Sequence, residues 1–226
     1  MHEFDYLSPP SLNSTPIGFP NFAPPKFLMD SIVKCLDNPL NHQYVPPRGV
    51  PRLLEALSKL LSPSYQRIGH NQPKLIDPAS EILVTQGANQ AILVIFQTYL
   101  RPGDVVLVLA PFFDIYEPLV VTTGAKLVSV PFDLDTESLA SLQSGSVPSV
   151  TAESLFRFPF QALREAIDAH GREKCKFLLL NSPHNPSGKC WTEKESVEIC
   201  NFVKSETDLA LISDEVASFL LYNIDI

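Results

Sequence analysis

The stretch Lys176-Phe177-Leu178-Leu179-Leu180, followed at once by Asn181-Ser182-Pro183-His184-Asn185-Pro186-Ser187-Gly188, indicates how the chain folds. The first part is a short apolar run, which predicts a buried strand. In the second part, two Asn and two Pro residues within eight positions specify a rigid turn that is not helical. Such a turn can hold the Asn185 amide in a pocket, or its asparagines can simply stabilise the turn itself. The residues alone leave both readings open.

The same alternation of apolar strand and amphipathic helix extends outward in both directions. We expect strands at residues 81–85, 105–109, 126–130, 176–180 and 209–212, and helices at 89–100, 114–122, 160–170 and 192–205. Short apolar strands separated by helices predict an α/β fold with a mostly parallel sheet sandwiched by helices.

The flanking segments have a different composition. Prolines crowd residues 1 to about 30, which predicts an extended arm without regular helix or strand. Leucines at helical spacing after Pro51 predict an amphipathic helix. The Ser/Thr-rich stretch 135–153 is interpreted as a surface insertion, with the alternative that it orders near the mouth of the site.

Composition excludes several classes of function. The 226 residues carry a formal net charge of −8, so no basic field attracts nucleic acid or acidic lipids. No apolar run approaches the ~18 residues of a membrane span, and no targeting segment is recognisable. The four cysteines lack metal-type spacing and are interpreted as reduced thiols, so no metal site is expected. We expect a cytoplasmic protein, with mitochondria as the alternative if an N-terminal presequence has been lost.

Polar residues gather where the predicted strands end, which is where ligands bind in parallel α/β sheets. Gly87 precedes a helix start that can bind an anion, or it serves the turn geometry alone. Phe113 follows a strand and is either a platform for a planar ring or part of the core. Asp214 follows another strand, and is either a helix cap or the counter-charge to a cationic ligand.

Read together and in order, several motifs carry a family resemblance. They are Gly18-Phe19-Pro20-Asn21-Phe22-Ala23-Pro24-Pro25, Gln43-Tyr44, Gly49-Val50-Pro51-Arg52-Leu53, Val84-Thr85-Gln86-Gly87-Ala88, Pro102-Gly103-Asp104, Pro111-Phe112-Phe113-Asp114-Ile115-Tyr116-Glu117-Pro118, Asn181 to Lys189, and Ser213-Asp214-Glu215-Val216. Over residues 17–222 the series resembles the class I/II (fold type I) pyridoxal-phosphate-dependent aminotransferases. The motifs that begin at Gly18 and at Pro111 are similar to those of the kynurenine/glutamine transaminase branch, which includes cysteine-S-conjugate β-lyases.

The resemblance implies pyridoxal 5′-phosphate as cofactor and assigns residues to it. The phosphate-binding turn of the family corresponds to Gly87, Ala88 and Asn89, and its ring-stacking aromatic to Phe113. The asparagine that binds the phenolic oxygen corresponds to Asn185, and the aspartate that pairs with the pyridine nitrogen to Asp214. A carboxylate at that nitrogen keeps it protonated, which lets the ring accept electrons from the substrate.

Further implications concern the substrate, the dimer and the domains. Gly18 matches a glycine of the substrate pocket, and Tyr44 matches a tyrosine that reaches the cofactor of a neighbouring subunit, which implies a homodimer for the full-length protein. Residues 1–45 correspond to an N-terminal arm and small-domain segment, and 46–226 to the large cofactor-binding domain, incomplete at its C-terminus.

The resemblance also implies what these residues do not contain. The family's S-x-S-K segment with the Schiff-base lysine would follow Ile226, so no catalytic lysine is assigned, and Lys189 does not match it. Ala217 stands where the family usually has a tyrosine. The implied activity is transfer of an amino group from an aromatic amino acid, kynurenine or glutamine to a 2-oxo acid, with the 226 residues alone expected to be inactive. The alternatives are a non-catalytic or partner-dependent cofactor-binding remnant, and a related C–S β-lyase.

Overall fold

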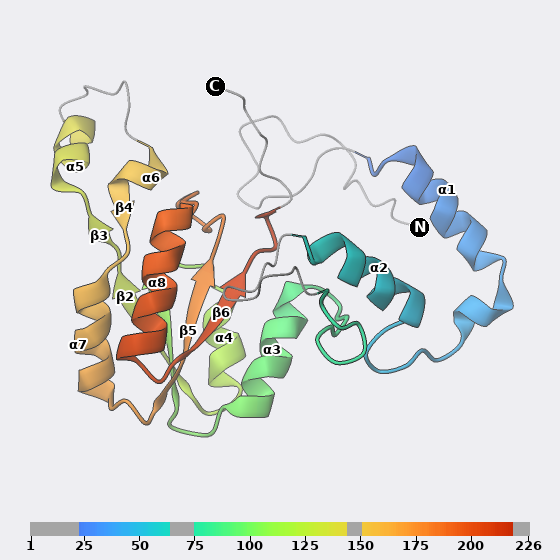
Figure 1. Cartoon of the computed structure of the whole chain (residues 1–226), viewed down its shortest axis with the longest axis horizontal. Coiled ribbons are helices and arrows are strands. Elements are labelled where there is room, and N and C mark those ends of the chain that lie inside the picture. The colour runs from blue at the N-terminus through green and yellow to red at the C-terminus, as the bar shows by residue number, and fades with distance from the viewer. Residues whose placement is uncertain (1–22, 64–74, 144–150, 219–226) are drawn as a thin grey trace, which may run out of the picture. The chain divides into compact units, whose positions relative to one another are not determined.

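The computed structural model describes residues 23–63, 75–143 and 151–218 (Figure 1). The chain forms two compact units, Met1–Leu83 and Val84–Ile226, and each is described by itself. The domain boundary expected between residues 45 and 46 falls inside the first unit, and it stays a prediction.

In its described residues, the first unit contains three helical elements, α1 (Lys26–Leu36), η2 (Pro39–His42) and α2 (Pro51–Leu61). Helix α2 begins at Pro51 as predicted, because proline at the first helical position needs no backbone partner. Residues 26–30 were expected to belong to an extended arm, and they form the start of α1 instead. The reason is local, since the crowded prolines stop at Pro25 and the following eleven residues contain none.

The second unit is built on a four-stranded sheet with the order β2-β1-β5-β6. Its strands are β1 (Val105–Ala110), β2 (Lys126–Pro131), β5 (Cys175–Asn181) and β6 (Ala210–Asp214). Every neighbouring pair is parallel, which confirms the predicted sheet. The central strands β1 and β5 are almost entirely buried, as expected of apolar strands covered on both faces.

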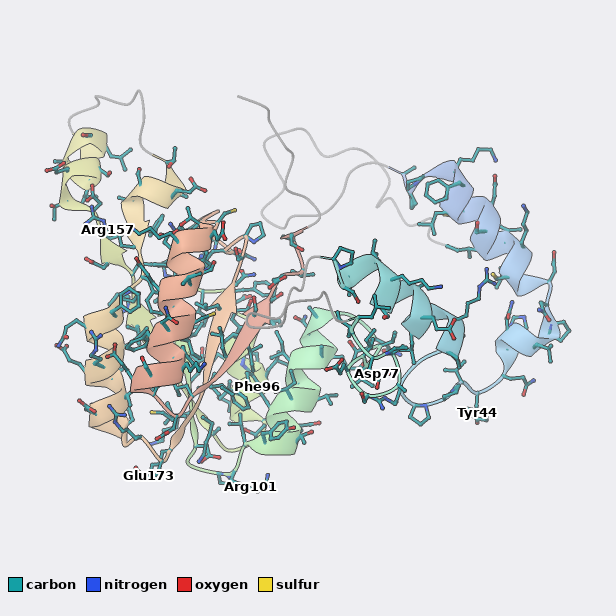
Figure 2. All side chains as sticks on the ribbon, in the orientation of Figure 1. Tyr44, Asp77, Phe96, Arg101, Arg157 and Glu173 are labelled. Carbon is teal, nitrogen blue, oxygen red and sulfur yellow. The ribbon has the colours of Figure 1, made fainter. Side chains whose placement is uncertain are left out.

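Helices cover both faces of this sheet and make two hydrophobic clusters. One face carries α3 (Ala88–Tyr99) and α4 (Tyr116–Val121), and Phe96 of α3 is completely buried there (Figure 2). The other face carries α7 (Phe160–His170) and α8 (Glu193–Glu206), whose buried residues pack on the alternate side chains of β1 and β5. The predicted three-layer α/β arrangement is therefore confirmed.

One local prediction was wrong, and a second segment has more regular structure than its composition indicated. Residues 81–85 were expected to form a strand, but they have no strand conformation and pair with no described strand. The stretch 135–153 was expected to be a surface insertion of turn and loop composition. Its described part contains helix α5 (Thr136–Gln143) and the start of α6 (Ala152–Leu155), and the paired strands β3 (Asp133–Leu134) and β4 (Phe156–Arg157) flank it.

The chain connections create a crevice at the carboxyl ends of β1 and β5. From β1 the chain passes through α4 on one face to β2, whereas from β5 it passes through α8 on the opposite face to β6. The segments that leave these two neighbouring strands therefore diverge. In open α/β sheets this is the point at which ligands bind.

Candidate active site

A cavity of about 380 Å³ lies at these strand ends. Its lining comes from four places: the start of α3, the segment from the end of β1 to the start of α4, the end of β5 with the turn after it, and the end of β6 with the residues after it. The lining residues are Gln86, Gly87, Ala88, Asn89, Phe113, Tyr116, Asn181, Pro183, Asn185, Asp214, Val216 and Ala217. All six residues that the resemblance assigned to the cofactor within this unit are among them. Residues more than a hundred positions apart thus converge on one space.

One side of the cavity is the beginning of helix α3. Gly87 precedes the helix with φ +99° and ψ 171°, a conformation that only glycine adopts readily, and a Cβ atom there would meet no other atom within 4 Å. The N–H groups of the first helical turn have no partner within the helix, and together with the helix dipole they favour an anion. This side of the cavity suits a phosphate group.

Asp214 lies in the cavity wall, at the end of strand β6. Its side chain is buried, and the Tyr116 hydroxyl donates a hydrogen bond to Oδ2 at 2.6 Å, while the Val216 N–H donates to Oδ1 at 3.1 Å. Among the ion pairs of the described residues, none includes Asp214. Both hydrogen bonds come from neutral donors. The bond from the Val216 N–H is the one that the cap reading predicts, and the role as counter-charge stays a prediction.

The turn after β5 uses its two asparagines differently. Asn181 fixes the backbone, because its Nδ2 donates to the Asp214 carbonyl at 2.9 Å and its Oδ1 accepts from the Asn185 N–H at 2.7 Å. The Asn185 side chain lines the cavity, and no hydrogen bond engages its amide within the described part of the chain. Both readings of this turn are therefore present, on different residues.

Phe113 belongs to the core and also borders the cavity, while its role as a platform for a planar ring stays a prediction. Its ring packs against the hydrophobic cluster under α3 and α4, and it also lines the cavity. It meets the ring of Tyr116 edge to face, with the centroids 5.7 Å apart and an interplanar angle of 89°. The contact fixes the plane of Phe113, as a stacking platform requires.

The sequence analysis did not single out five cavity residues, Gln86, Tyr116, Asn181, Pro183 and Val216. Tyr116 stands within the Pro111–Pro118 motif, but its hydrogen bond to Asp214 joins residues 98 positions apart in the chain. No pattern in the sequence around Tyr116 predicts such a contact. For Asn181, the parallel pairing of β5 with β6, which places it beside Asp214, was the available signal.

Three other residues named from the sequence lie elsewhere. Gly18 lies outside the described residues. Tyr44 belongs to the first unit, where its side chain is fully exposed on the loop after η2 (Figure 2). Lys189 does not line the cavity, and its buried Nζ donates to Glu195 Oε1 at 2.6 Å and to the Glu153 carbonyl at 3.2 Å. These bonds support the assignment of Lys189 to a structural role.

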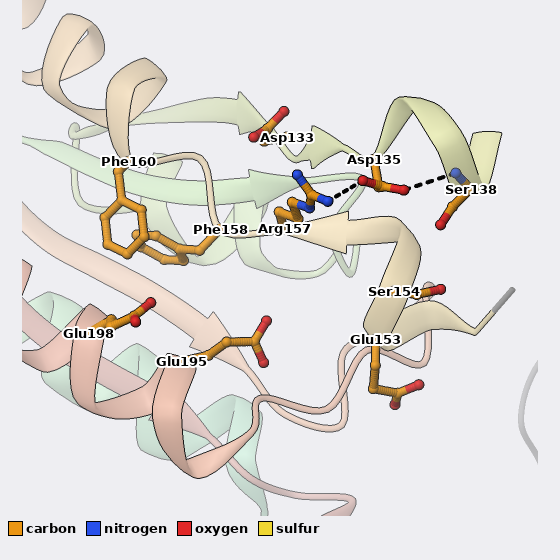
Figure 3. A pocket seen from close by; sticks show the side chains of 10 residues that line it. All are labelled: Asp133, Asp135, Ser138, Glu153, Ser154, Arg157, Phe158, Phe160, Glu195 and Glu198. Carbon is orange, nitrogen blue, oxygen red and sulfur yellow. Dashed lines mark hydrogen bonds and ion pairs between the residues drawn. The ribbon is translucent and has the colours of Figure 1, made fainter. Parts of the chain in front are cut away.

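A second, larger cavity of about 570 Å³ lies between α8 and the segments around β3 and β4 (Figure 3). Its lining is dominated by carboxylates, and Arg157, its basic residue, pairs with Asp135. It contains none of the residues that the sequence analysis selected. In the described ranges no group of three or more His, Cys, Asp or Glu residues could hold a metal ion. Nor is any described helix long and apolar enough to cross a membrane.

Known proteins share both sequence and fold with this chain. It is 34% identical over 216 residues to kynurenine–oxoglutarate transaminase 3 of Mus musculus, an alignment that covers 94% of this chain and 42% of the mouse protein. The crystal structure of Bna3p from Saccharomyces cerevisiae superposes with a TM-score of 0.75 at 34% identity, covering 92% of this chain and 44% of the yeast chain. An aromatic aminotransferase from Pyrococcus horikoshii gives a TM-score of 0.71 at 32% identity, covering 92% and 47%.

The chain thus spans less than half the length of each of these proteins. Nearly all of this chain nevertheless matches one protein family. Residues 16–220 fit the family described as aminotransferase class I and II. This confirms the resemblance found in the motifs and the fold expected from it. The chain belongs to the class I and II aminotransferases.

Proposed function

We propose that this chain is the cofactor-binding part of a transaminase that moves an amino group from an aromatic amino acid, kynurenine or glutamine to a 2-oxo acid. The relatives named as kynurenine–oxoglutarate transaminases and the archaeal aromatic aminotransferase support this choice of substrates. Both substrates are small molecules, so the partners of the site are amino acids and 2-oxo acids.

Class I and II aminotransferases use pyridoxal 5′-phosphate, and the cavity fits that molecule. When bound, the cofactor supplies a protonated pyridine ring that withdraws electrons from the amino acid substrate. A phosphate ester, a flat aromatic ring and a ring nitrogen need three kinds of contact. The cavity offers the start of α3, the face of Phe113 and the carboxylate of Asp214.

Each residue has a role that follows from its chemistry. Gly87, Ala88 and Asn89 present backbone N–H groups and the positive end of α3 to the phosphate. Phe113 sets the plane of the ring, and the Asn185 amide is available to donate a hydrogen bond to the phenolic oxygen. Asp214 holds a proton on the ring nitrogen.

The observation that carries the proposal is the pairing of opposite electrostatic features in one cavity. A buried carboxylate without a cationic partner among the described residues is costly, because burial removes the water that would stabilise its charge. A helix N-terminus in the same cavity attracts negative charge. A ligand that carries a cationic nitrogen and an anionic phosphate satisfies both.

Binding of 4′-deoxypyridoxine 5′-phosphate to the purified 226-residue chain tests this directly. The compound keeps the ring nitrogen, the phenol and the phosphate of the cofactor but has no aldehyde, so it cannot react with surface lysines. Isothermal titration calorimetry is run on the wild type, on Asp214→Asn, and on Asp133→Asn as a control, since Asp133 is an exposed aspartate outside the cavity.

We expect the wild type and Asp133→Asn to bind equally, and Asp214→Asn to bind at least about 30-fold more weakly, the equivalent of ~2 kcal/mol for a desolvated charge pair. No binding to the wild type, or equal binding to Asp214→Asn, would contradict the proposed site.

Product analysis separates transamination from the alternative β-lyase reaction. Kynurenine and 2-oxoglutarate yield glutamate in the first reaction, whereas a cysteine S-conjugate yields pyruvate, ammonia and a thiol in the second. The assay is run on the complete protein, because the 226 residues alone are expected to be inactive. A complete protein that binds the probe but catalyses neither reaction supports the reading as a non-catalytic or partner-dependent cofactor-binding remnant. Treatment with pyridoxal phosphate and borohydride adds a control: a specific adduct at Lys189 would contradict the structural role of that residue.

We also propose that the complete protein is a homodimer, in which Tyr44 reaches the cofactor of the other subunit. The full exposure of Tyr44 is compatible with such a contact. A cytoplasmic location is proposed as well, supported by the four cysteines, all of which are free. Sedimentation velocity and cell fractionation test the two proposals, with mitochondria as the alternative location.

A further inference from the structure

Tyr116 connects the two residues that hold opposite parts of the proposed ligand. Its backbone N–H donates to the Phe113 carbonyl at 3.1 Å, and its ring contacts the Phe113 ring edge to face. Its hydroxyl donates to Asp214 Oδ2 at 2.6 Å. Phe113, proposed to face the ring plane, and Asp214, proposed to face the ring nitrogen, are therefore both in contact with Tyr116.

The surroundings of Tyr116 leave its side chain little freedom. The residue is 2% exposed and belongs to the hydrophobic cluster under α3 and α4, yet it also contributes to the cavity wall. Burial, and then the hydrogen bond and the charge of Asp214, raise the pKa of its phenol well above the usual value. The hydroxyl therefore keeps its proton and remains a donor to the carboxylate.

A neutral donor acts on a carboxylate differently from a cation. An arginine or lysine in this position would cancel the charge of Asp214 and leave little attraction for a ligand. The Tyr116 hydroxyl fixes one oxygen and the Val216 N–H contacts the other, and neither donor brings a positive charge. The backbone below is fixed as well, because Asn181 donates to the Asp214 carbonyl.

We propose that Tyr116 is a positioning residue, which holds the Asp214 carboxylate in the orientation that binds a protonated ring nitrogen and thereby makes the cavity discriminate in favour of nitrogen-containing rings. This inference rests on the proposed function, because it assumes that a cofactor of the pyridoxal phosphate class occupies the cavity. Tyr116 acts through Asp214, to which its hydroxyl donates its hydrogen bond.

Two probes that differ at a single ring atom test the inference. One is 4′-deoxypyridoxine 5′-phosphate, and the other is a hydroxybenzyl phosphate of matched substitution in which a C–H group replaces the ring nitrogen. Their dissociation constants are measured by calorimetry on the wild type and on Tyr116→Phe, which removes only the hydroxyl. Tyr99→Phe is the matched control, since Tyr99 is largely exposed and lies outside the cavity.

We expect the wild type to prefer the nitrogen-containing probe. In Tyr116→Phe this preference should fall about five- to tenfold, because the lost hydrogen bond was made to a charged group, whereas the affinity for the nitrogen-free probe should change less than twofold. Tyr99→Phe should match the wild type with both probes. A general loss of structure would weaken both probes alike, so the ratio distinguishes positioning from packing.

An equal loss for both probes, or no loss for either, would overturn the inference. If Tyr116→Phe does not fold, Tyr116→Met also lacks the hydroxyl and fills an apolar site with a flexible side chain, and it should give the same ratio. Failure of the proposed function has a separate signature, because the wild type would then bind neither probe. If Asp214→Asn loses affinity while Tyr116→Phe keeps the full preference, the proposed function stands and the role of Tyr116 is rejected.

Discussion

Gly87 is the cavity residue whose backbone conformation most disfavours substitution. Its φ of +99° and ψ of 171° lie in a region that side chains with a Cβ atom rarely enter. Gly103 has a similar φ of +89°, and a Cβ added at either position would meet nothing within 4 Å. The two glycines therefore differ in location and not in steric crowding.

Alanine at either glycine should lower the free energy of unfolding by about 1–3 kcal/mol, because the backbone is strained in both cases. Only Gly87→Ala should also weaken binding of 4′-deoxypyridoxine 5′-phosphate, since Gly103 lies outside the cavity. Urea unfolding and calorimetry measure the two effects. Equal affinities for the two variants would contradict a role of the Gly87 turn in holding phosphate.

At this scale the sequence identified residues that follow directly from a strand end. Asp214, Asn185 and Phe113 could be selected because each stands just after an apolar run and carries a side chain suited to a ligand. Tyr116 could not, because its significance depends on the distant Asp214. Its place in the sequence is equally compatible with an ordinary core tyrosine.

Among the elements, helix α8 is joined to the turn after β5 by a buried ion pair. The Lys189 side chain is 1% exposed and pairs with Glu195, whose side chain is 25% exposed and also accepts hydrogen bonds from Thr192 at the helix start. The Lys189 ammonium lies 5.1 Å from the centre of the Trp191 ring. The pair therefore anchors the turn that carries Asn185.

Removing the charge of Glu195 alone should be more harmful than removing both charges. Glu195→Gln keeps an acceptor for the helix cap but leaves the buried Lys189 unpaired, and should cost about 3 kcal/mol, the low end for a buried pair because Glu195 is partly exposed. Lys189→Met in that background should recover most of the loss, since methionine packs well beside Trp191. Urea unfolding of the single and double variants measures this; a double variant as unstable as Glu195→Gln would refute it.

The same pair predicts a dependence of stability on acid. Burial raises the pKa of Glu195, but hydrogen bonds from Lys189 and Thr192 outweigh it, and the net effect lowers that pKa. A carboxyl with a lowered pKa in the folded state stabilises the fold above its unfolded pKa, and this contribution is lost as pH falls through the folded pKa. Between about pH 5 and pH 3, the wild type should therefore lose more stability than Lys189→Met/Glu195→Gln. Parallel urea curves at both pH values for the two proteins would exclude the contribution.

Elements were predictable where local pattern and tertiary packing agree. Helix α7 begins at Phe160 and ends at His170 as expected, because its apolar residues recur at helical spacing and Gly171 follows with φ +90°. Residues 81–85 have a strand-like composition, but a strand needs a hydrogen-bonded neighbour, and the described sheet provides none there. Within 135–153, composition concealed helix α6, whose capping box between Thr151 and Ser154 uses the residue types that also favour loops.

For the molecule as a whole, the cavity is built from residues of one of the two units. Every residue that lines the cavity belongs to the unit Val84–Ile226. Binding of 4′-deoxypyridoxine 5′-phosphate should therefore slow amide hydrogen exchange around residues 86–89, 181–185 and 214–217.

A homodimer with Tyr44 at the neighbouring cavity would alter that result. Protection would then extend to the loop around Tyr44 and would increase with protein concentration, and Tyr44→Phe would bind the probe more weakly only under dimeric conditions. Hydrogen exchange at two protein concentrations, with sedimentation as a check on the oligomeric state, distinguishes the two cases. Concentration-independent exchange at Tyr44 would count against the shared site.

The cavity is assembled from positions that run from Gln86 to Ala217, and its last contributor follows the edge strand β6. During synthesis on the ribosome, the helix start that suits phosphate emerges long before the carboxylate that suits the ring nitrogen. A nascent chain that has left the exit tunnel only as far as β5 would lack the carboxylate of Asp214 and should not retain the cofactor. Capture of the cofactor should thus be a late event, one that marks chains in which strands β1, β5 and β6 have already paired.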